Sequence, residues 1–294
     1  MLSGLYHLAD QTALLARKLV LSGDLVIKEK NGPMDLLTNV DVANQAFIVG
    51  NLLKTWPNLH IIGEEDQNVV HQFEEIQVNR ETLKKEIPKS LVCPIDDIIV
   101  YIDPIDGTKE FTEGVFSQVT ILIGISFKGT PIAGIVCQPW REDSKDAQRG
   151  VFLWGLVDHG VSPIDPSLFG SKLLSLPSQP SYPSPQSQNL TLAITRSRST
   201  PELEALVQKH QFKDVLRVGG CGYKILLLIL EKADVYIQAN PGTNRWDTCG
   251  PEAILRAAGG RLTDLSGKDY RYVQGNVRNE EGVIALRKNV KFDI

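Results

Sequence analysis

The sequence lacks the features that would place the protein in several large classes. Neither sign of charge dominates, because 31 basic and 35 acidic residues leave a net charge of −4. That balance argues against a nucleic-acid partner or a polybasic membrane anchor. No apolar run approaches the roughly 20 residues that a bilayer span requires. Cysteines are few and form no CxxC pair, which excludes a zinc knuckle or a dense disulfide scaffold; they are Cys93, Cys137, Cys221 and Cys249.

The N-terminus lacks the features of a secretory signal. Residues 1–7 have neither a basic segment nor a continuous apolar one. Apolar residues make up 42% of the chain and charged residues 22%, which is typical of a folded globular protein. We therefore expect a cytoplasmic protein with free thiols, no membrane anchor and no nucleic-acid partner, as a monomer or weak homodimer.

The pattern of apolar residues divides the chain into two halves of different type. Residues 1–160 begin with two helical segments and continue with strands rich in β-branched residues, as in an α+β layer. Residues 190–294 alternate strand and helix, which is the α/β pattern. Residues 161–189 are rich in proline and serine and are predicted to form a loop between the halves.

The expected elements follow from the same patterns. In the first half, helices are predicted over 5–21 and 42–56 and strands over 59–62, 98–102, 119–127, 132–138 and 151–154. In the second half, strands are predicted over 192–195, 215–218, 233–237 and 261–264, and helices over 201–210, 221–231 and 247–258.

The segment Asp103–Thr108 carries the most chemical information. It follows an apolar strand, and its sequence DPIDGT places two carboxylates three residues apart on a tight turn. With the Ile105 carbonyl between them, Asp103 and Asp106 would form an all-oxygen ligand set suited to Mg²⁺. Asp-Pro and Asp-Gly are each ordinary turn dipeptides, but their combination in one hexamer is much rarer.

Other segments could contribute to the same site. Glu64 follows a second strand, in an acidic run that is by itself typical of a solvated face. Asp247 opens a helix, where a plain N-cap is the ordinary interpretation. If Glu64, Asp103 and Asp106 converge, each pair at 4 Å repels by about 4 kcal/mol at an effective dielectric of 20, and a divalent cation would remove that repulsion. The glycine-rich segment 219–222 precedes a helix and would either admit a ligand or form a simple turn.

Together these segments resemble a known family. Gly63–Asp66, Asp103–Phe111 and Trp246–Cys249 are similar, in order and approximate spacing, to segments of the inositol monophosphatase superfamily of lithium-sensitive, Mg²⁺-dependent phosphatases. The resemblance covers most of the chain and implies a layered αβαβα sandwich. Two further segments, Thr195–Ser197 and Arg217–Lys224, resemble the branch that hydrolyses adenosine 3′,5′-bisphosphate to AMP and phosphate.

The resemblance also implies the role of each site residue. The Mg²⁺ ligands would be Glu64, Asp103, the Ile105 carbonyl, Asp106 and Asp247. Asp41 and Thr108 would orient and deprotonate a metal-bound water that attacks phosphorus in line. The nucleotide pocket would be lined by Thr108, Thr195, Arg198, Gly220 and Lys224. Arg198 departs from the pattern, because relatives tend to have histidine there; arginine can stack on a base or pair with a phosphate.

Two alternatives share this metal core. An inositol polyphosphate 1-phosphatase would have the same ligands and differ in the residues of the second half that face the substrate. A catalytically silent metal- or nucleotide-binding regulator would have lost a ligand or the water-activating pair, and this sequence retains both.

Overall fold

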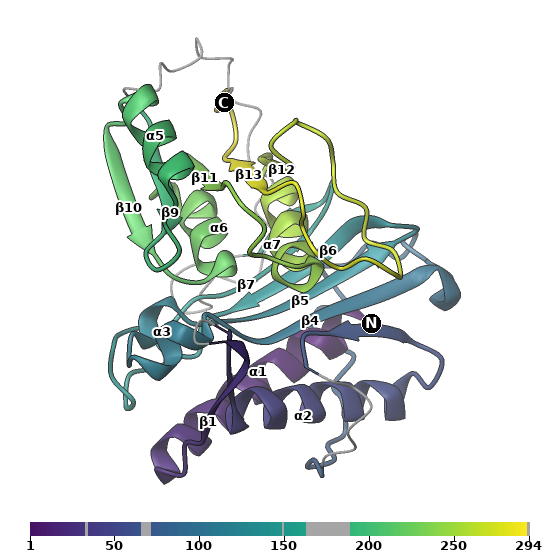
Figure 1. The fold of residues 1–294 in the computed structure, drawn as a ribbon. Helices are drawn as coiled ribbons and strands as arrows, with labels where there is room; N and C mark the ends of the chain where they lie inside the picture. Colours follow the sequence, from purple (N-terminus) through teal and green to yellow (C-terminus); the bar gives the residue numbers. More distant parts are fainter. Residues whose placement is uncertain (33–34, 66–71, 149, 163–188, 293–294) are drawn as a thin grey trace.

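Five alternating layers of helix and sheet make up the protein (Figure 1). The computed structural model describes residues 1–32, 35–65, 72–148, 150–162 and 189–292. Two helices form the first layer, a six-stranded sheet the second, two helices the third, a five-stranded sheet the fourth and one helix the fifth. The expected αβαβα sandwich is therefore confirmed.

The first half of the chain supplies the outer helices and the six-stranded sheet. The sheet has the strand order β3-β4-β5-β6-β7-β8 and is antiparallel except for the parallel pair β3 and β4. The elements are α1 (Leu2–Ser22), β1 (Ile27–Gly32), β2 (Asp35–Thr38), α2 (Asn39–Thr55), β3 (His60–Gly63), β4 (Ile98–Asp106), α3 (Thr108–Thr112), β5 (Thr120–Phe127), β6 (Thr130–Cys137), β7 (Phe152–Leu156) and β8 (Gly160–Val161), with 3₁₀ turns at Ile95–Asp97 and Phe116–Gln118.

The second half supplies the remaining three layers. Its sheet has the order β10-β9-β11-β13-β12, in which β9 is parallel to β10 and β11, and β13 is antiparallel to its two neighbours. The elements are β9 (Thr191–Thr195), α5 (Pro201–His210), β10 (Asp214–Val218), α6 (Cys221–Ile229), β11 (Val235–Gln238), α7 (Arg245–Ala257), β12 (Arg261–Thr263) and β13 (Val283–Leu286).

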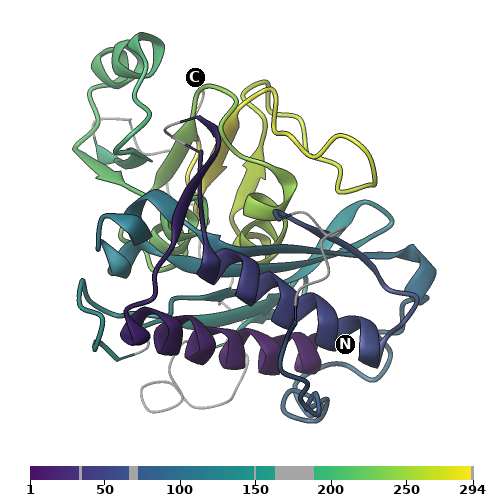
Figure 2. The same ribbon diagram turned by 60° about the horizontal axis from the view of Figure 1, so that its bottom comes forward.

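Strand β4 shows why the layers stack. Its apolar run is buried on both faces, because Val100 and Ile102 pack against the α1–α2 layer while Tyr101 packs against the α6–α7 layer. Full burial of each such side chain contributes roughly 1.5–3 kcal/mol. Figure 2 shows α1 and α2 lying side by side under the sheet. A continuous apolar strand therefore marks a sheet covered on both sides.

Strands β1, β2, β8 and β13 were not predicted from the sequence. The β1–β2 hairpin precedes α2, and its residues are mostly polar or charged, so they carry no apolar alternation. Strand β13 completes the second sheet after a long irregular segment. Most of the predicted 161–189 loop lies outside the described residues, although Val161 belongs to β8. Within the described part of the chain, no helix is long and apolar enough to cross a bilayer.

Candidate active site

A cavity of about 570 Å³ opens where the end of β4 meets the N-termini of α6 and α7. It therefore lies between the two halves of the chain, with acidic side chains from the first half facing main-chain N–H groups and cations from the second. Ten of the predicted site residues line it: Glu64, Asp103, Ile105, Asp106, Thr108, Thr195, Arg198, Gly220, Lys224 and Asp247.

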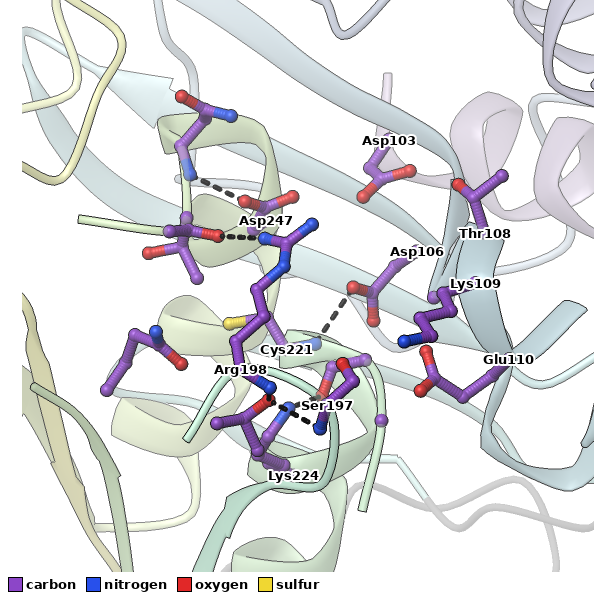
Figure 3. Close-up of a pocket in the computed structure, with 18 of the residues that line it drawn as sticks. Asp103, Asp106, Thr108, Lys109, Glu110, Ser197, Arg198, Cys221, Lys224 and Asp247 are labelled. Atoms are coloured by element: carbon purple, nitrogen blue, oxygen red, sulfur yellow. Dashed lines mark hydrogen bonds between the residues drawn. The ribbon is translucent and has the colours of Figure 1, made fainter. Parts of the chain in front are cut away.

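Three carboxylates lie close together in this cavity (Figure 3). Asp103, Asp106 and Asp247 each offer an oxygen that lies within 4.8 Å of the other two. Burial, together with repulsion from neighbouring acids, raises the pKa of Asp103 well above its usual value and that of Asp247 to about 8. Each ionised pair at this separation repels by about 3–4 kcal/mol at an effective dielectric of 20. A divalent cation would relieve that repulsion, and the donor atoms are all oxygen, as Mg²⁺ prefers.

Asp106 is fixed by donors from both halves of the chain. Its Oδ1 accepts a hydrogen bond from Cys221 N–H at 2.8 Å, and its Oδ2 accepts one from Gly222 N–H at 2.8 Å. The Thr120 hydroxyl on β5 also donates to Oδ2, at 2.7 Å. The first turn of α6 is thereby bound to the end of β4, so this carboxylate joins the two halves as well as facing the cavity.

The glycines before and within α6 allow this close approach. A Cβ on Gly219 would lie 2.0 Å from the Glu110 carboxyl carbon, and one on Gly220, whose φ is 59°, would lie 2.8 Å from Asp106 Oδ2. A Cβ on Gly222 would lie 2.4 Å from a Leu122 methyl group. The structure thus explains the glycines of segment 219–222 by the packing of α6 against the acidic residues, with Gly220 also lining the cavity.

Asp41 and Asp247 are positioned by the same helix-capping device. Each is the third residue of its helix and accepts a hydrogen bond from the N-cap backbone: Thr38 N–H at 2.8 Å for Asp41, and Asn244 N–H at 2.5 Å for Asp247. Asp247 is therefore not the N-cap, because α7 begins at Arg245 with Asn244 as its cap. One oxygen of each carboxylate is committed to the cap, which fixes where the other one points.

Glu64 follows β3 and lines the cavity, but it lies outside the cluster of three carboxylates. Lys30 on β1 lies between two acids, 3.1 Å from Glu64 Oε1 and 2.6 Å from Glu65 Oε1. The negative charge of Glu64 still contributes to the raised pKa of Asp103 and of Asp247. The residue is thus electrostatically part of the site and is neutralised by a lysine from the hairpin.

Thr108 is the first residue of α3, and its hydroxyl lies between two acceptors. Its Oγ1 is 3.3 Å from Asp41 Oδ1 and 3.1 Å from the Ile105 carbonyl oxygen. Burial raises the pKa of Asp41 to about 7, opposed by the hydrogen bond from Thr38. A hydroxyl has a single proton, so Thr108 can donate to only one of the two acceptors at a time. The pair predicted to activate water is therefore in direct contact.

The opposite side of the cavity is basic. Lys224 is buried, and its Nζ donates to the Gly220 carbonyl at 2.6 Å. Arg198 donates from Nη1 to the Gly242 carbonyl at 3.2 Å, and its guanidinium reaches across the cavity toward Asp247 (Figure 3). Thr195 accepts from Arg198 N–H at 3.2 Å, so its side chain holds the turn after β9.

Some residues of the cavity were missed in the sequence. Lys109 and Glu110 line it and directly follow the DPIDGT segment, so their neighbourhood was the signal that could have found them. Arg278 also lines it, from the irregular segment between β12 and β13, where no motif marks it. Trp246 also lines the cavity, directly before Asp247 in the sequence.

Comparison with known proteins found a matching family model and several similar proteins. A model of the inositol monophosphatase family matches residues 1–291. The proteins named 3′(2′),5′-bisphosphate nucleotidase 1 from Homo sapiens and Rattus norvegicus are 37% and 36% identical over 294 residues, which covers 98% of this chain and 90% of each relative. The crystal structure of an IMPase/NADP phosphatase complexed with Mg²⁺ and phosphate matches with a TM-score of 0.67 at 16% identity, over 96% of this chain and 88% of that one. The last likeness shows the fold alone, whereas the matched residues of the first two include every segment that builds the cavity.

Proposed function

The chain belongs to the inositol monophosphatase family, and on that premise we propose that it is a Mg²⁺-dependent phosphomonoesterase that converts adenosine 3′,5′-bisphosphate to AMP and phosphate. The observation that carries the proposal is the convergence of Asp103, Asp106 and Asp247 in a cavity whose far side is cationic. The substrate class is supported by the relatives at 36–37% identity, which are named as nucleotidases for such a bisphosphate.

The buried carboxylates would hold the ion, with Glu64 and the Ile105 carbonyl as further ligands on the same side of the cavity. When bound, Mg²⁺ would stabilise negative charge on the phosphoryl oxygens and acidify water. For Glu64 to contribute, its carboxylate has to exchange Lys30 for the ion. The three aspartates need no comparable exchange, because hydrogen bonds already hold each of them in place.

Thr108 and Asp41 would handle the proton. Thr108 would orient the attacking water through Oγ1 while its own proton is directed to Asp41 Oδ1, 3.3 Å away. A proton from the water would then be relayed to the Asp41 carboxylate, which is a far better base than a hydroxyl. Attack in line with the departing ribose oxygen gives phosphate directly, without a covalent phosphoenzyme.

The basic side would bind the nucleotide. Thr195, Arg198, Gly220 and Lys224 line the same cavity as the three carboxylates, and they would contact the nucleoside and its remaining phosphate. Inhibition by lithium, a cytoplasmic location and a monomeric or weakly dimeric state are further predictions of this proposal.

The test is phosphate release from adenosine 3′,5′-bisphosphate by the full chain, with Mg²⁺ and with a chelator. We expect turnover that requires the metal and that lithium inhibits. Inositol 1,4-bisphosphate, assayed beside it, examines the inositol polyphosphate 1-phosphatase alternative, and faster hydrolysis of the inositol compound would reverse the assignment. Tight nucleotide binding without release of phosphate from either compound would instead favour the silent regulator.

A further inference from the structure

The segment around Arg278 is bound to the N-terminus of α7. Arg245 N–H donates to the Val277 carbonyl at 2.6 Å, and Arg278 forms an isolated β-bridge with Asn244. Asn279, whose side chain is completely buried, donates from its amide to the Asn244 carbonyl at 2.9 Å. The residues on both sides of Arg278 are therefore anchored to Asn244 and Arg245, and Asn244 lies three residues before Asp247 in the sequence.

In contrast to its anchored backbone, the side chain of Arg278 is largely exposed. It lines the cavity and is 59% exposed. Its nearest carboxylate is Glu280, at 3.9 Å from Nε, which is beyond hydrogen-bond distance. Within the described ranges, no hydrogen bond to the Arg278 guanidinium is found. An anchored backbone thus presents a planar cation at the cavity, paired only loosely with Glu280 and otherwise open to solvent.

Neighbouring cations are committed differently. Lys224 Nζ is bound to a carbonyl of its own helix cap, and Arg198 Nη1 is bound to the Gly242 carbonyl. Burial lowers the pKa of Lys224, which weakens it as a permanent charge. Arg278 keeps five N–H donors on a planar, positively charged fork, which suits a phosphate better than a neutral group.

We propose that Arg278 binds the second phosphate of the substrate, the one that is not hydrolysed, and so favours nucleoside bisphosphates over monophosphates. This inference rests on the proposed function. The reacting phosphate has to lie at the carboxylate cluster, and Arg278 belongs to the segment hydrogen-bonded to the cap of the helix that carries Asp247. A substrate that spans the cavity from the cluster to its rim would place its other phosphate at this guanidinium.

The experiment compares two substrates that differ only in the second phosphate. We expect Arg278→Ala to raise KM for adenosine 3′,5′-bisphosphate by about 10- to 100-fold, which corresponds to a lost charge-assisted hydrogen bond, with little change in kcat. The same variant should hydrolyse 3′-AMP with the kcat/KM of the wild type. Arg278→Lys should recover part of the loss, because it restores the charge without the planar fork.

The matched control is Arg261→Ala, which removes an exposed arginine on β12 that pairs with Asp269. It changes the net charge equally and should leave both substrates unaffected. Equal losses for both substrates in Arg278→Ala, or no loss for either, would overturn the assignment of Arg278.

A binding measurement keeps this inference separate from the proposed function. AMP retains only the phosphate that is not removed, so calorimetry should show that Arg278→Ala weakens AMP but leaves adenosine unchanged. If the wild type hydrolyses neither nucleotide, the proposed function fails, while the contrast between AMP and adenosine still decides whether Arg278 binds a phosphate. Equal binding of AMP by variant and wild type would refute it.

Discussion

The acidic and basic sides of the cavity are built in different ways. Asp103, Asp106 and Asp247 are all buried or nearly so and accept hydrogen bonds from main-chain N–H groups. Arg198 lies in the loop between β9 and α5 and Arg278 in the loop between β12 and β13, and Arg198 Nη1 donates to the Gly242 carbonyl. The acidic side is therefore determined by the backbone of the fold. On the basic side, Lys224 is fixed within α6, whereas the two arginines depend on the loops that carry them.

This difference separates two properties of the site. Changes on the acidic side should alter the rate of the chemical step, because an ion acts mainly on charge that develops in the transition state. Changes on the basic side should alter which molecule binds and how tightly, since those side chains meet parts of the substrate that do not react. Measuring kcat and KM separately for variants of each side tests this division.

Asp103→Asn should produce the largest effect, a loss of about a thousandfold in kcat, because one charged ligand of the cluster becomes neutral. Asparagine can still accept the hydrogen bond that Ile105 N–H donates to Oδ1 at 3.0 Å, so the free energy of unfolding should change little. Steady-state kinetics, Mg²⁺ calorimetry and urea unfolding measure the three quantities.

The comparison with Asp106→Asn sharpens this test. Both oxygens of Asp106 accept from N–H groups of α6, so an amide would turn a donor toward a donor and lower the free energy of unfolding by about 1–3 kcal/mol. Asp269→Asn, an exposed acid paired with Arg261, is the control. If Asp103→Asn keeps the wild-type kcat, Asp103 is not a ligand of the ion.

Glu252 provides the next test, because it is a buried acid of α7 outside the cavity. Its Oε2 accepts from the Tyr272 hydroxyl at 2.5 Å, and Arg256 lies 3.6 Å from Oε1. Burial raises the pKa of Glu252 from 4.5 to about 7. The folded protein therefore retains a proton there that the unfolded chain has lost, and stability falls as the pH rises through this window, by about 3 kcal/mol in total.

Glu252→Gln should remove this part of the pH dependence and leave the part due to Asp41 and Asp247. The variant should therefore be more stable than the wild type at pH 8 and equal to it at pH 4.5. Thermal unfolding across pH 4.5–8 measures it, with the exposed Glu81→Gln as the control. Saturating Mg²⁺ should stabilise both proteins equally, because Glu252 lies outside the cavity that we propose to hold the ion. If the free energy of unfolding of the wild type instead rises between pH 4.5 and 8, the predicted direction of the pH dependence is wrong.

The contrast between the two sides also explains how much the sequence could predict. Asp103 and Asp106 were found because a turn motif brings them together locally. The convergence with Asp247 came from a resemblance, since nothing in the spacing of 141 residues between Asp106 and Asp247 determines a contact. The α+β and α/β character of the two halves followed from apolar periodicity, which depends on burial, whereas the αβαβα layering was implied by the resemblance.

The sequence missed the elements whose position depends on partners. The β1–β2 hairpin has no apolar face, and its role is to carry Lys30 to Glu64 and to deliver Thr38 as the cap of α2. Arg278 has a place in the site only because Val277 and Asn279 bond to the start of α7. Such tertiary hydrogen bonds leave no periodic trace in a sequence.

Thr108→Val should lower kcat by about a hundredfold while KM changes little, because the variant keeps the shape of threonine but cannot relay a proton to Asp41. Thr108→Ser restores the hydroxyl and should recover most of the rate. The Mg²⁺ affinity of the valine variant, measured by calorimetry, should match the wild type. A parallel loss of metal binding would mean that Thr108 acts by holding the Ile105 carbonyl, 3.1 Å away, and would place it among the ion's supports.

We expect the smallest effect on kinetics from substitution of Arg198. The same substitution tests most directly whether the two sides of the cavity have separate roles. If Arg198 binds the nucleotide, Arg198→Ala should raise KM for adenosine 3′,5′-bisphosphate by about tenfold and leave kcat within about twofold. Its guanidinium also reaches toward Asp247 (Figure 3), so it could instead neutralise the cluster, and then kcat and Mg²⁺ affinity would change with KM unaltered. Arg198→His separates the two roles, because a neutral imidazole can still stack on a base but cannot offset a carboxylate above its pKa. Recovery of KM by histidine at pH 8 would assign Arg198 to the substrate, since at that pH only contact with the nucleotide, and not charge, is restored.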